Sequence, residues 1–192
     1  MEGTQTRRRW LQRATVYALS MTLAGALTGL AFSAAGRAVD EVWPDAHLPF
    51  TFALGVVALA YALHEFELIR LPVPGRDWQV PAGWVRHNFY RSAVIFGSTV
   101  GFGVFTRVPY ATFPILLAWL FVAGDPIYGV AAGLLYGALR ALSIYSSAGA
   151  GAPEDLVGLN QQLMRLTPLQ HQLAGLALAA FAAYLLLAPA LS

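Results

Sequence analysis

Apolar residues along this chain gather in long runs that are separated by short polar segments. Four of the runs cover approximately residues 14–35, 50–68, 127–145 and 169–187. Each run is close to the ~20 apolar residues that a helix needs to cross a bilayer. Together with the stretch described next, they predict an all-α integral membrane protein, a bundle of five or six transmembrane elements in one polytopic domain over residues 1–192.

The apolar stretch over residues 92–123 is too long for a single straight span. As one helix it would reach about 48 Å, whereas the hydrocarbon core of a bilayer is about 30 Å thick. Pro109 lies near its middle. Proline lacks a backbone N–H and biases the residue before it away from helical geometry. The sequence therefore predicts two short helices joined near residues 106–110, arranged either as a helical hairpin or as one broken helix.

A weaker pattern precedes the last apolar run. Over residues 154–166, leucines recur at helical spacing with polar residues between them. Such a short amphipathic helix is typical of a segment that lies in the membrane interface. We therefore expect an interfacial helix over residues 154–166, separate from the last span.

Composition supports a membrane protein, because 57% of the residues are hydrophobic and only 11% are charged. A soluble domain of this size usually carries about twice that share of charge. The chain has no cysteine, which excludes disulfides and thiol chemistry of its own, and its net charge of +2 does not indicate a nucleic-acid partner. All of its basic residues are arginine, which favours a bacterial source.

The distribution of arginine predicts the topology. The N-terminus carries Arg7, Arg8, Arg9 and Arg13, residues 70–91 carry four more, and the loop between the first two runs is acidic. The positive-inside rule then places the N-terminus in the cytoplasm, and we expect a multi-pass protein of the bacterial cytoplasmic (inner) membrane. The N-terminus also resembles a twin-arginine export signal, but we favour a first transmembrane helix with a basic anchor.

Glycines at every fourth position predict close helix packing. Without side chains, such a face lets two membrane helices approach backbone to backbone. The pattern fits either a static interface, which we favour, or a sliding helix pair. The glycines concerned are Gly25 and Gly29, Gly97 and Gly101, and Gly129, Gly133 and Gly137.

The broken segment, residues 97–114, is the predicted functional region. Backbone groups freed by a helix break at membrane depth are tolerated only inside protein or along a wet cavity. Arg107 at the break would bind an anion or pair with Asp125; alternatively, it only caps a loop at the membrane surface. The predicted pathway residues are Thr106, Arg107, Tyr110, Thr112 and Asp125.

Residues 92–140 resemble the transmembrane domain of the CcdA/DsbD thiol-electron transporters. The shared features are a glycine-rich run, a proline-broken helix and a following glycine-rich helix with a tyrosine. The redox cysteines of that family are missing from this chain. The resemblance therefore implies a similar helix break, and it does not imply electron transfer.

No motif indicates an enzyme, a cofactor or a metal centre. His64 and Glu67 share a helical face, but two ligands do not make a metal site, and His171 is expected to be solvated at a membrane surface. We expect a small transporter or channel-like component with its pathway near residues 97–114. The alternative is a non-catalytic accessory subunit that packs into a larger membrane complex through its glycine-rich faces. The expected partners are the lipid bilayer and membrane-protein subunits or further copies of this chain, not nucleic acid.

Overall fold

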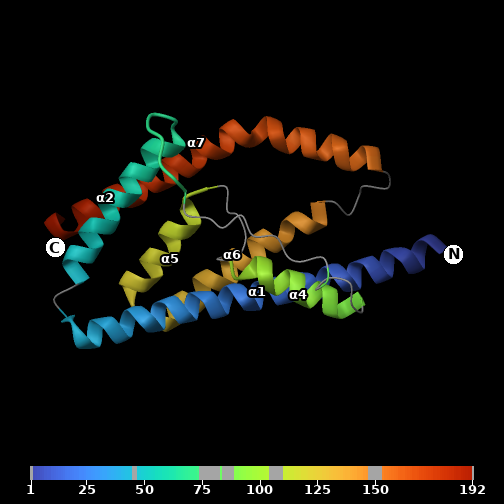
Figure 1. Cartoon of the computed structure of the whole chain (residues 1–192), viewed down its shortest axis with the longest axis horizontal. Coiled ribbons are helices and arrows are strands. Elements are labelled where there is room, and N and C mark those ends of the chain that lie inside the picture. Colours follow the sequence, from blue (N-terminus) through green and yellow to red (C-terminus); the bar gives the residue numbers. More distant parts are fainter. Residues whose placement is uncertain are drawn as a thin grey trace. The chain divides into compact units, whose positions relative to one another are not determined.

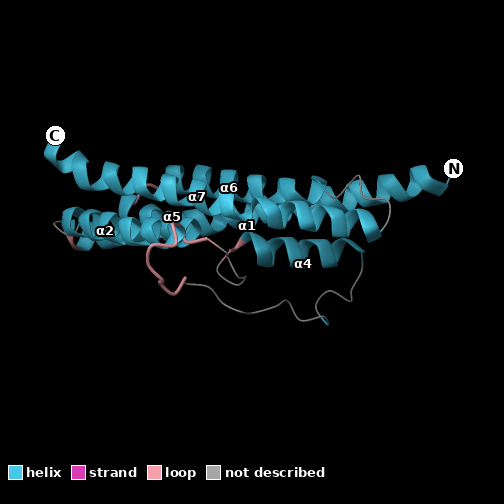
Figure 2. Ribbon diagram, turned by 90° about the horizontal axis from the view of Figure 1, so that it is seen from above, coloured by secondary structure: helices cyan, strands magenta, loops and turns pink. Residues whose placement is uncertain are grey.

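All regular structure described in this computed structural model is helical (Figure 2), which confirms the predicted all-α class. The structure describes residues 2–44, 47–73, 83, 89–103, 110–146 and 153–191. Within these residues the helices are α1 (Glu2–Val42), α2 (His47–Glu65), α4 (Phe89–Gly101), α5 (Thr112–Ala123), α6 (Pro126–Ser146) and α7 (Pro153–Leu191) (Figure 1).

Three helices are long and apolar enough to cross a membrane, over Arg8–Val42, His47–Glu65 and Met164–Leu187. They are compatible with a membrane location. By contrast, α5 has 12 residues and would span only about 18 Å of a ~30 Å hydrocarbon core. The described residues thus contain three candidate spans, whereas the sequence predicted five or six transmembrane elements.

The stretch over residues 92–123 forms two helices, as its length and its prolines predict. The first of them, α4, ends at Gly101, and the chain turns at Gly103, whose φ of 66° is a left-handed conformation that glycine adopts without a steric cost. The Gly103 N–H donates to the carbonyl of Val100 at 3.1 Å. The choice between a hairpin and a broken helix falls on residues 104–109, which lie outside the described residues.

The C-terminal region corrects one expectation. A separate interfacial helix was predicted over residues 154–166, whereas the structure has one continuous helix from Pro153 to Leu191. The change from polar to apolar composition near residue 166 does not interrupt the backbone of the helix. Pro168 removes only one backbone donor, and membrane helices tolerate such a loss.

The described chain divides into two compact units, which are treated separately below. The first unit consists of residues 1–31, 75–107 and 127–151, and the second of residues 32–74, 108–126 and 152–192. The long helix α1 contributes residues to both units.

In the first unit, α1 contacts α6 and α4 through glycines. A Cβ atom added to Gly133 would lie 2.7 Å from the carbonyl carbon of Gly25, and one added to Gly29 would lie 2.8 Å from that of Gly129. A Cβ atom on Gly97 would meet the Tyr17 carbonyl oxygen at 2.6 Å. Since no real Cβ atom comes so close to backbone, each position requires glycine.

In the second unit, α2 packs along α7 and against α5 (Figure 1). Its core combines four alanines with three leucines and one isoleucine. The buried members are Leu54, Ala58, Ala62, Ala111, Ile115, Leu178, Ala182 and Leu185. Trp119 packs edge-on against Phe181, with ring centroids 5.4 Å apart. The small residues allow the helices to lie close together, as in many membrane bundles.

Large apolar side chains cover the outside of the helices. On α1, Leu19, Leu23 and Leu27 are each more than half exposed, whereas Ala24 is buried. Exposed apolar surface of this extent is unusual on a soluble monomer and marks a surface that contacts lipid or protein. With leucines on the outside as well as in the core, the structure is compatible with a membrane location.

Candidate functional site

The candidate site lies at the C-terminal end of α2 and is centred on Glu65, the last residue of that helix. The Leu68 N–H donates to the Leu63 carbonyl at 3.0 Å, and the Glu67 N–H donates to the His64 carbonyl at 2.9 Å. Glu67 has a φ of 60°. These bonds form a Schellman motif, in which a left-handed residue ends the helix. Although the apolar run continues to residue 68, the helix therefore stops at Glu65.

Glu65 is buried, although it is an ionisable residue at the end of an apolar helix. Only 1% of its side chain is exposed. Its two carboxylate oxygens have different partners: Oε1 accepts the backbone N–H of Ala111 at 2.9 Å, and Oε2 lies 2.6 Å from Nδ1 of His171. We call Glu65, Tyr110, Ala111, Gln170 and His171 the Glu65 cluster; all five belong to the second unit.

The bond to Ala111 explains how α5 begins. Ala111 is the N-cap residue of this helix and has no side-chain oxygen of its own to serve as a cap. In a capping box, a glutamate of the same helix accepts the N–H of the N-cap residue. Here Glu65 supplies the carboxylate from a different helix, and its negative charge lies at the positive end of the α5 dipole. Pro114 fits into the first turn of α5, where its missing N–H costs little.

His171 connects the buried carboxylate to the protein surface. About 34% of its side chain is exposed, against 1% for Glu65. With Glu65 ionised, its carboxylate only accepts hydrogen bonds, so Nδ1 of His171 is then the donor in this contact of 2.6 Å. A partly exposed imidazole thus touches a buried carboxyl group.

Tyr110 packs against the imidazole of His171. Its ring centroid lies 5.0 Å from that of His171 at an angle of 65°, and its hydroxyl donates to Oε1 of Gln170 at 2.5 Å. Burial, followed by the negative charge of Glu65, raises the pKa of Tyr110 above its ordinary value of 10.0. The hydroxyl therefore stays protonated at neutral pH and keeps its role as a donor.

Burial of the Glu65 carboxylate costs free energy, and its hydrogen-bond partners offset this cost. A carboxylate removed from water costs several kcal/mol unless it is paired and hydrogen-bonded. Glu65 satisfies this condition with one backbone donor and one imidazole donor. Ionisable groups inside membrane proteins mark functional pathways more often than not, which makes this cluster the candidate site.

The structure brings only part of the predicted pathway together. Tyr110 belongs to the Glu65 cluster, and Thr112 is the first residue of α5. Asp125 is an exposed residue between α5 and α6. Thr106 and Arg107 lie outside the described residues, and so does the predicted pairing of Arg107 with Asp125.

Glu65 and His171 themselves were missed as site residues. The sequence places Glu65 between His64 and Glu67, the two residues that suggested a metal pair, and His171 was expected to be solvated. In the structure, Nδ1 of His64 accepts the Leu71 N–H at 3.1 Å. No group of three or more His, Asp or Glu side chains in the described part of the chain could hold a metal ion.

Comparisons with protein-family models, with curated proteins and with solved structures found no match to this chain. The Glu65 cluster therefore has to be interpreted from its own geometry.

Proposed function

We propose that this protein is a small transporter or channel-like component of a membrane, with the Glu65 cluster as a proton-binding site on its pathway. The observation that supports this proposal is the contact of 2.6 Å between a buried carboxylate and a partly exposed imidazole. Histidine is the side chain whose ordinary pKa lies nearest neutral pH, so it exchanges protons readily with water. The imidazole receives a proton at the surface and passes it inward to Glu65.

The cluster also connects this proposal to the predicted break in residues 97–114. Glu65 accepts the N–H of Ala111, which directly precedes α5 and follows the break. Protonation of the carboxylate would weaken that bond and so loosen the start of α5. Charge at Glu65 is thereby linked to the backbone of the segment that the sequence predicts to line the pathway.

Several finer features belong to the same proposal. We propose that α4, α5 and α6 complete the membrane region with the three longer helices. The N-terminus lies in the cytoplasm, and Thr106, Arg107 and Tyr110 are pathway residues. The similarity of residues 92–140 to the CcdA/DsbD transmembrane domain remains an expectation about the helix break alone.

Proton flux into liposomes tests this function. The purified protein is reconstituted with a pH-sensitive dye inside the vesicles, and a potassium gradient with valinomycin supplies the driving force. We expect Glu65→Gln to lower the flux at least tenfold with little change in melting temperature. Glutamine keeps an oxygen for the Ala111 N–H but cannot carry the proton.

Glu41→Gln is the matched control, because the Glu41 side chain is 70% exposed near the end of α1. The proton flux through the Glu41→Gln variant should equal that of the wild type. Wild-type flux no higher than that of empty liposomes would overturn the proposal. So would normal flux through Glu65→Gln, since the carboxylate would then act only as a cap for α5.

A second candidate is the accessory subunit of a larger membrane complex. The observation in its favour is the leucine-rich exterior, which suits a protein partner as well as lipid. The glycine faces fit this role less well, because backbone of this chain occupies the space where each glycine's side chain would be. Purification from the native membrane with stably bound subunits would support this candidate.

A further inference from the structure

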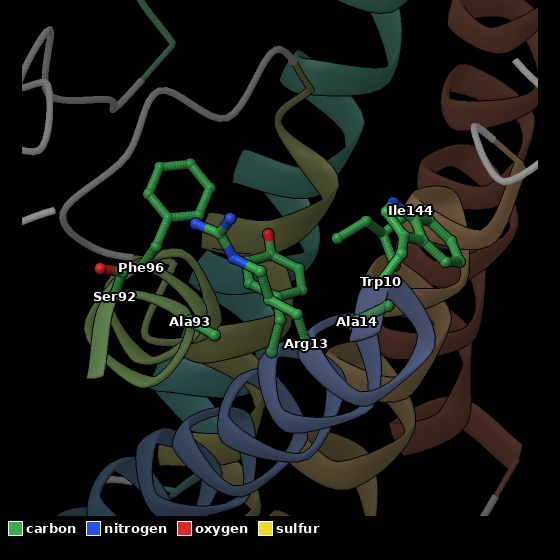
Figure 3. A pocket seen from close by; sticks show the side chains of 8 residues that line it. Trp10, Arg13, Ala14, Ser92, Ala93, Phe96 and Ile144 are labelled. Atoms are coloured by element: carbon green, nitrogen blue, oxygen red, sulfur yellow. The ribbon is translucent and has the colours of Figure 1, made fainter. Parts of the chain in front are cut away.

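The first unit contains a pocket of about 510 Å³ at the N-terminal end of α1 (Figure 3). Helices α1, α4 and α6 all contribute to its wall. Its lining consists of Trp10, Arg13, Ala14, Tyr17, Ser92, Ala93, Phe96 and Ile144. The volume is in the range of ordinary small-molecule sites, roughly 300–1,000 Å³. The pocket is distinct from the Glu65 cluster, because all of its lining residues belong to the first unit.

The lining combines one positive charge with an apolar wall. Figure 3 shows the Arg13 side chain rising from α1, with Phe96 to one side and Trp10 and Ile144 to the other. Two aromatic contacts hold the wall in place. The rings of Tyr17 and Phe96 stack at 5.7 Å, and those of Trp10 and Tyr145 meet edge to face at 6.3 Å.

The pocket lies where α1 passes from polar to apolar sequence. The candidate span of α1 begins at Arg8, and Arg8 and Arg9 are both exposed about one turn before Arg13. The apolar run starts immediately afterwards, at Ala14. Aromatic residues such as Trp10 are common at this level, where lipid head groups meet hydrocarbon. A molecule in the pocket would therefore contact the cationic side chain of Arg13 at one end and apolar side chains along the rest of its length.

We propose that this pocket binds an anionic phospholipid, with the phosphate on the Arg13 guanidinium and its acyl chains along the apolar wall of the pocket. A guanidinium matches the geometry of a phosphate and can bind two of its oxygens at once. Basic pockets between membrane helices are typical sites for anionic head groups, and clustered arginines next to a span attract them.

The apolar wall decides between a lipid and a free anion. A soluble phosphate would contact Arg13 and leave the apolar wall of the pocket uncovered. A phospholipid covers both parts, and the surrounding bilayer supplies it at high local concentration. The occupant is therefore the lipid and not its head group alone.

Binding of dioleoylphosphatidylglycerol to the detergent-solubilised full chain tests this site. Affinity is measured by native mass spectrometry, with dioleoylphosphatidylcholine and glycerol phosphate as comparisons. We expect the anionic lipid to bind at least tenfold more tightly than either. Arg13→Gln should reduce its affinity about tenfold, whereas Arg37→Gln, with the same change in net charge, should leave it unchanged.

Ile144→Trp provides a second variant, because it fills the pocket without changing charge. It should also weaken lipid binding about tenfold, and its melting temperature reports whether the chain still folds. Equal binding of the two lipids, or equal binding of glycerol phosphate, would overturn the proposal. So would unchanged affinity in folded Ile144→Trp, since the lipid would then bind through diffuse attraction to the arginines.

Discussion

Two helix contacts, one in each unit, hold their helices together by opposite means. In the first unit, α1 and α6 approach through Gly25, Gly29 and Gly133, where the absence of side chains lets backbone touch backbone. In the second unit, α2, α5 and α7 meet at Glu65, whose carboxylate bonds to both of its neighbours. The first interface should reject any added atom. The second should accept a polar side chain of the same shape and reject an apolar one.

The largest expected effect is that of Gly133→Leu, which would break the first interface. Its Cβ atom alone would lie 2.7 Å from the carbonyl carbon of Gly25, so α1 and α6 would have to separate. Overpacking usually costs ~1–3 kcal/mol, and here, against rigid backbone, we expect more than about 3 kcal/mol or failure to fold. Thermal melting and size-exclusion chromatography in detergent measure the change.

Leu134→Ala is the control for this variant, since Leu134 is 37% exposed on the same helix. It should lower the free energy of unfolding by less than about 1 kcal/mol, because little packing is lost. Equal melting temperatures for wild type and Gly133→Leu would contradict the close approach of the two helices.

Glu65→Ala is expected to have the next largest effect. Removal of one partner of a buried pair typically costs about 3–5 kcal/mol. In this case the Ala111 N–H would lose its acceptor and His171 its carboxylate. Glu65→Gln should cost only about 1 kcal/mol, because an amide oxygen still accepts a hydrogen bond.

A double-mutant cycle with His171→Gln measures the coupling of this pair. Residues in contact usually couple by about 0.5–3 kcal/mol, while independent sites add. Additive effects of the two changes would show that His171 and Glu65 do not interact in the folded protein.

Tyr110→Phe sharpens the comparison within the second unit. The change removes the hydrogen bond to Gln170 and should cost about 1 kcal/mol in the free energy of unfolding. Because the pKa of Tyr110 is raised above 10.0 in the folded protein, the stability linked to its neutral hydroxyl is present below about pH 10. This stability is lost as the pH rises through the pKa of Tyr110 in the folded protein. The difference in the free energy of unfolding between the wild type and the variant should therefore shrink there.

Tyr184→Phe is the matched control for denaturation as a function of pH, since Tyr184 is 61% exposed on α7. We expect no measurable change in stability near pH 7. A difference in the free energy of unfolding between Tyr110→Phe and the wild type that stays constant at all pH values would contradict the raised pKa of Tyr110.

The smallest effect is expected for Arg37→Gln. Arg37 forms an ion pair with Glu41 at 3.4 Å, but both side chains are more than 60% exposed. Such surface pairs contribute about 0–1 kcal/mol, and less at high salt. The free energies of unfolding of the variant and the wild type should agree within about 0.5 kcal/mol. Glu41 is then the exposed counterpart of the buried Glu65. A loss comparable to that of Glu65→Ala would remove the contrast between the two environments.

Local sequence features account for most of the fold. Runs of apolar residues predicted α1, α2, α6 and the apolar part of α7, and the length of residues 92–123 predicted two helices there. These features could be found because a run of about 20 apolar residues favours a membrane-spanning helix and because proline disfavours its continuation. Sequence reasoning failed at α7, since the polar start of this helix is continuous with its apolar end.

The candidate site depended on information that no local pattern contains. Sequence alone determined that this chain is a helical protein with apolar spans, with closely spaced glycines and with a break before α5. Only the tertiary structure decided that Glu65, rather than Glu67, is the buried carboxylate, because a left-handed turn at Glu67 ends the helix between them. It also decided that Glu65 meets His171, 106 positions further along the chain, since such a contact arises from helix packing and leaves no trace in spacing.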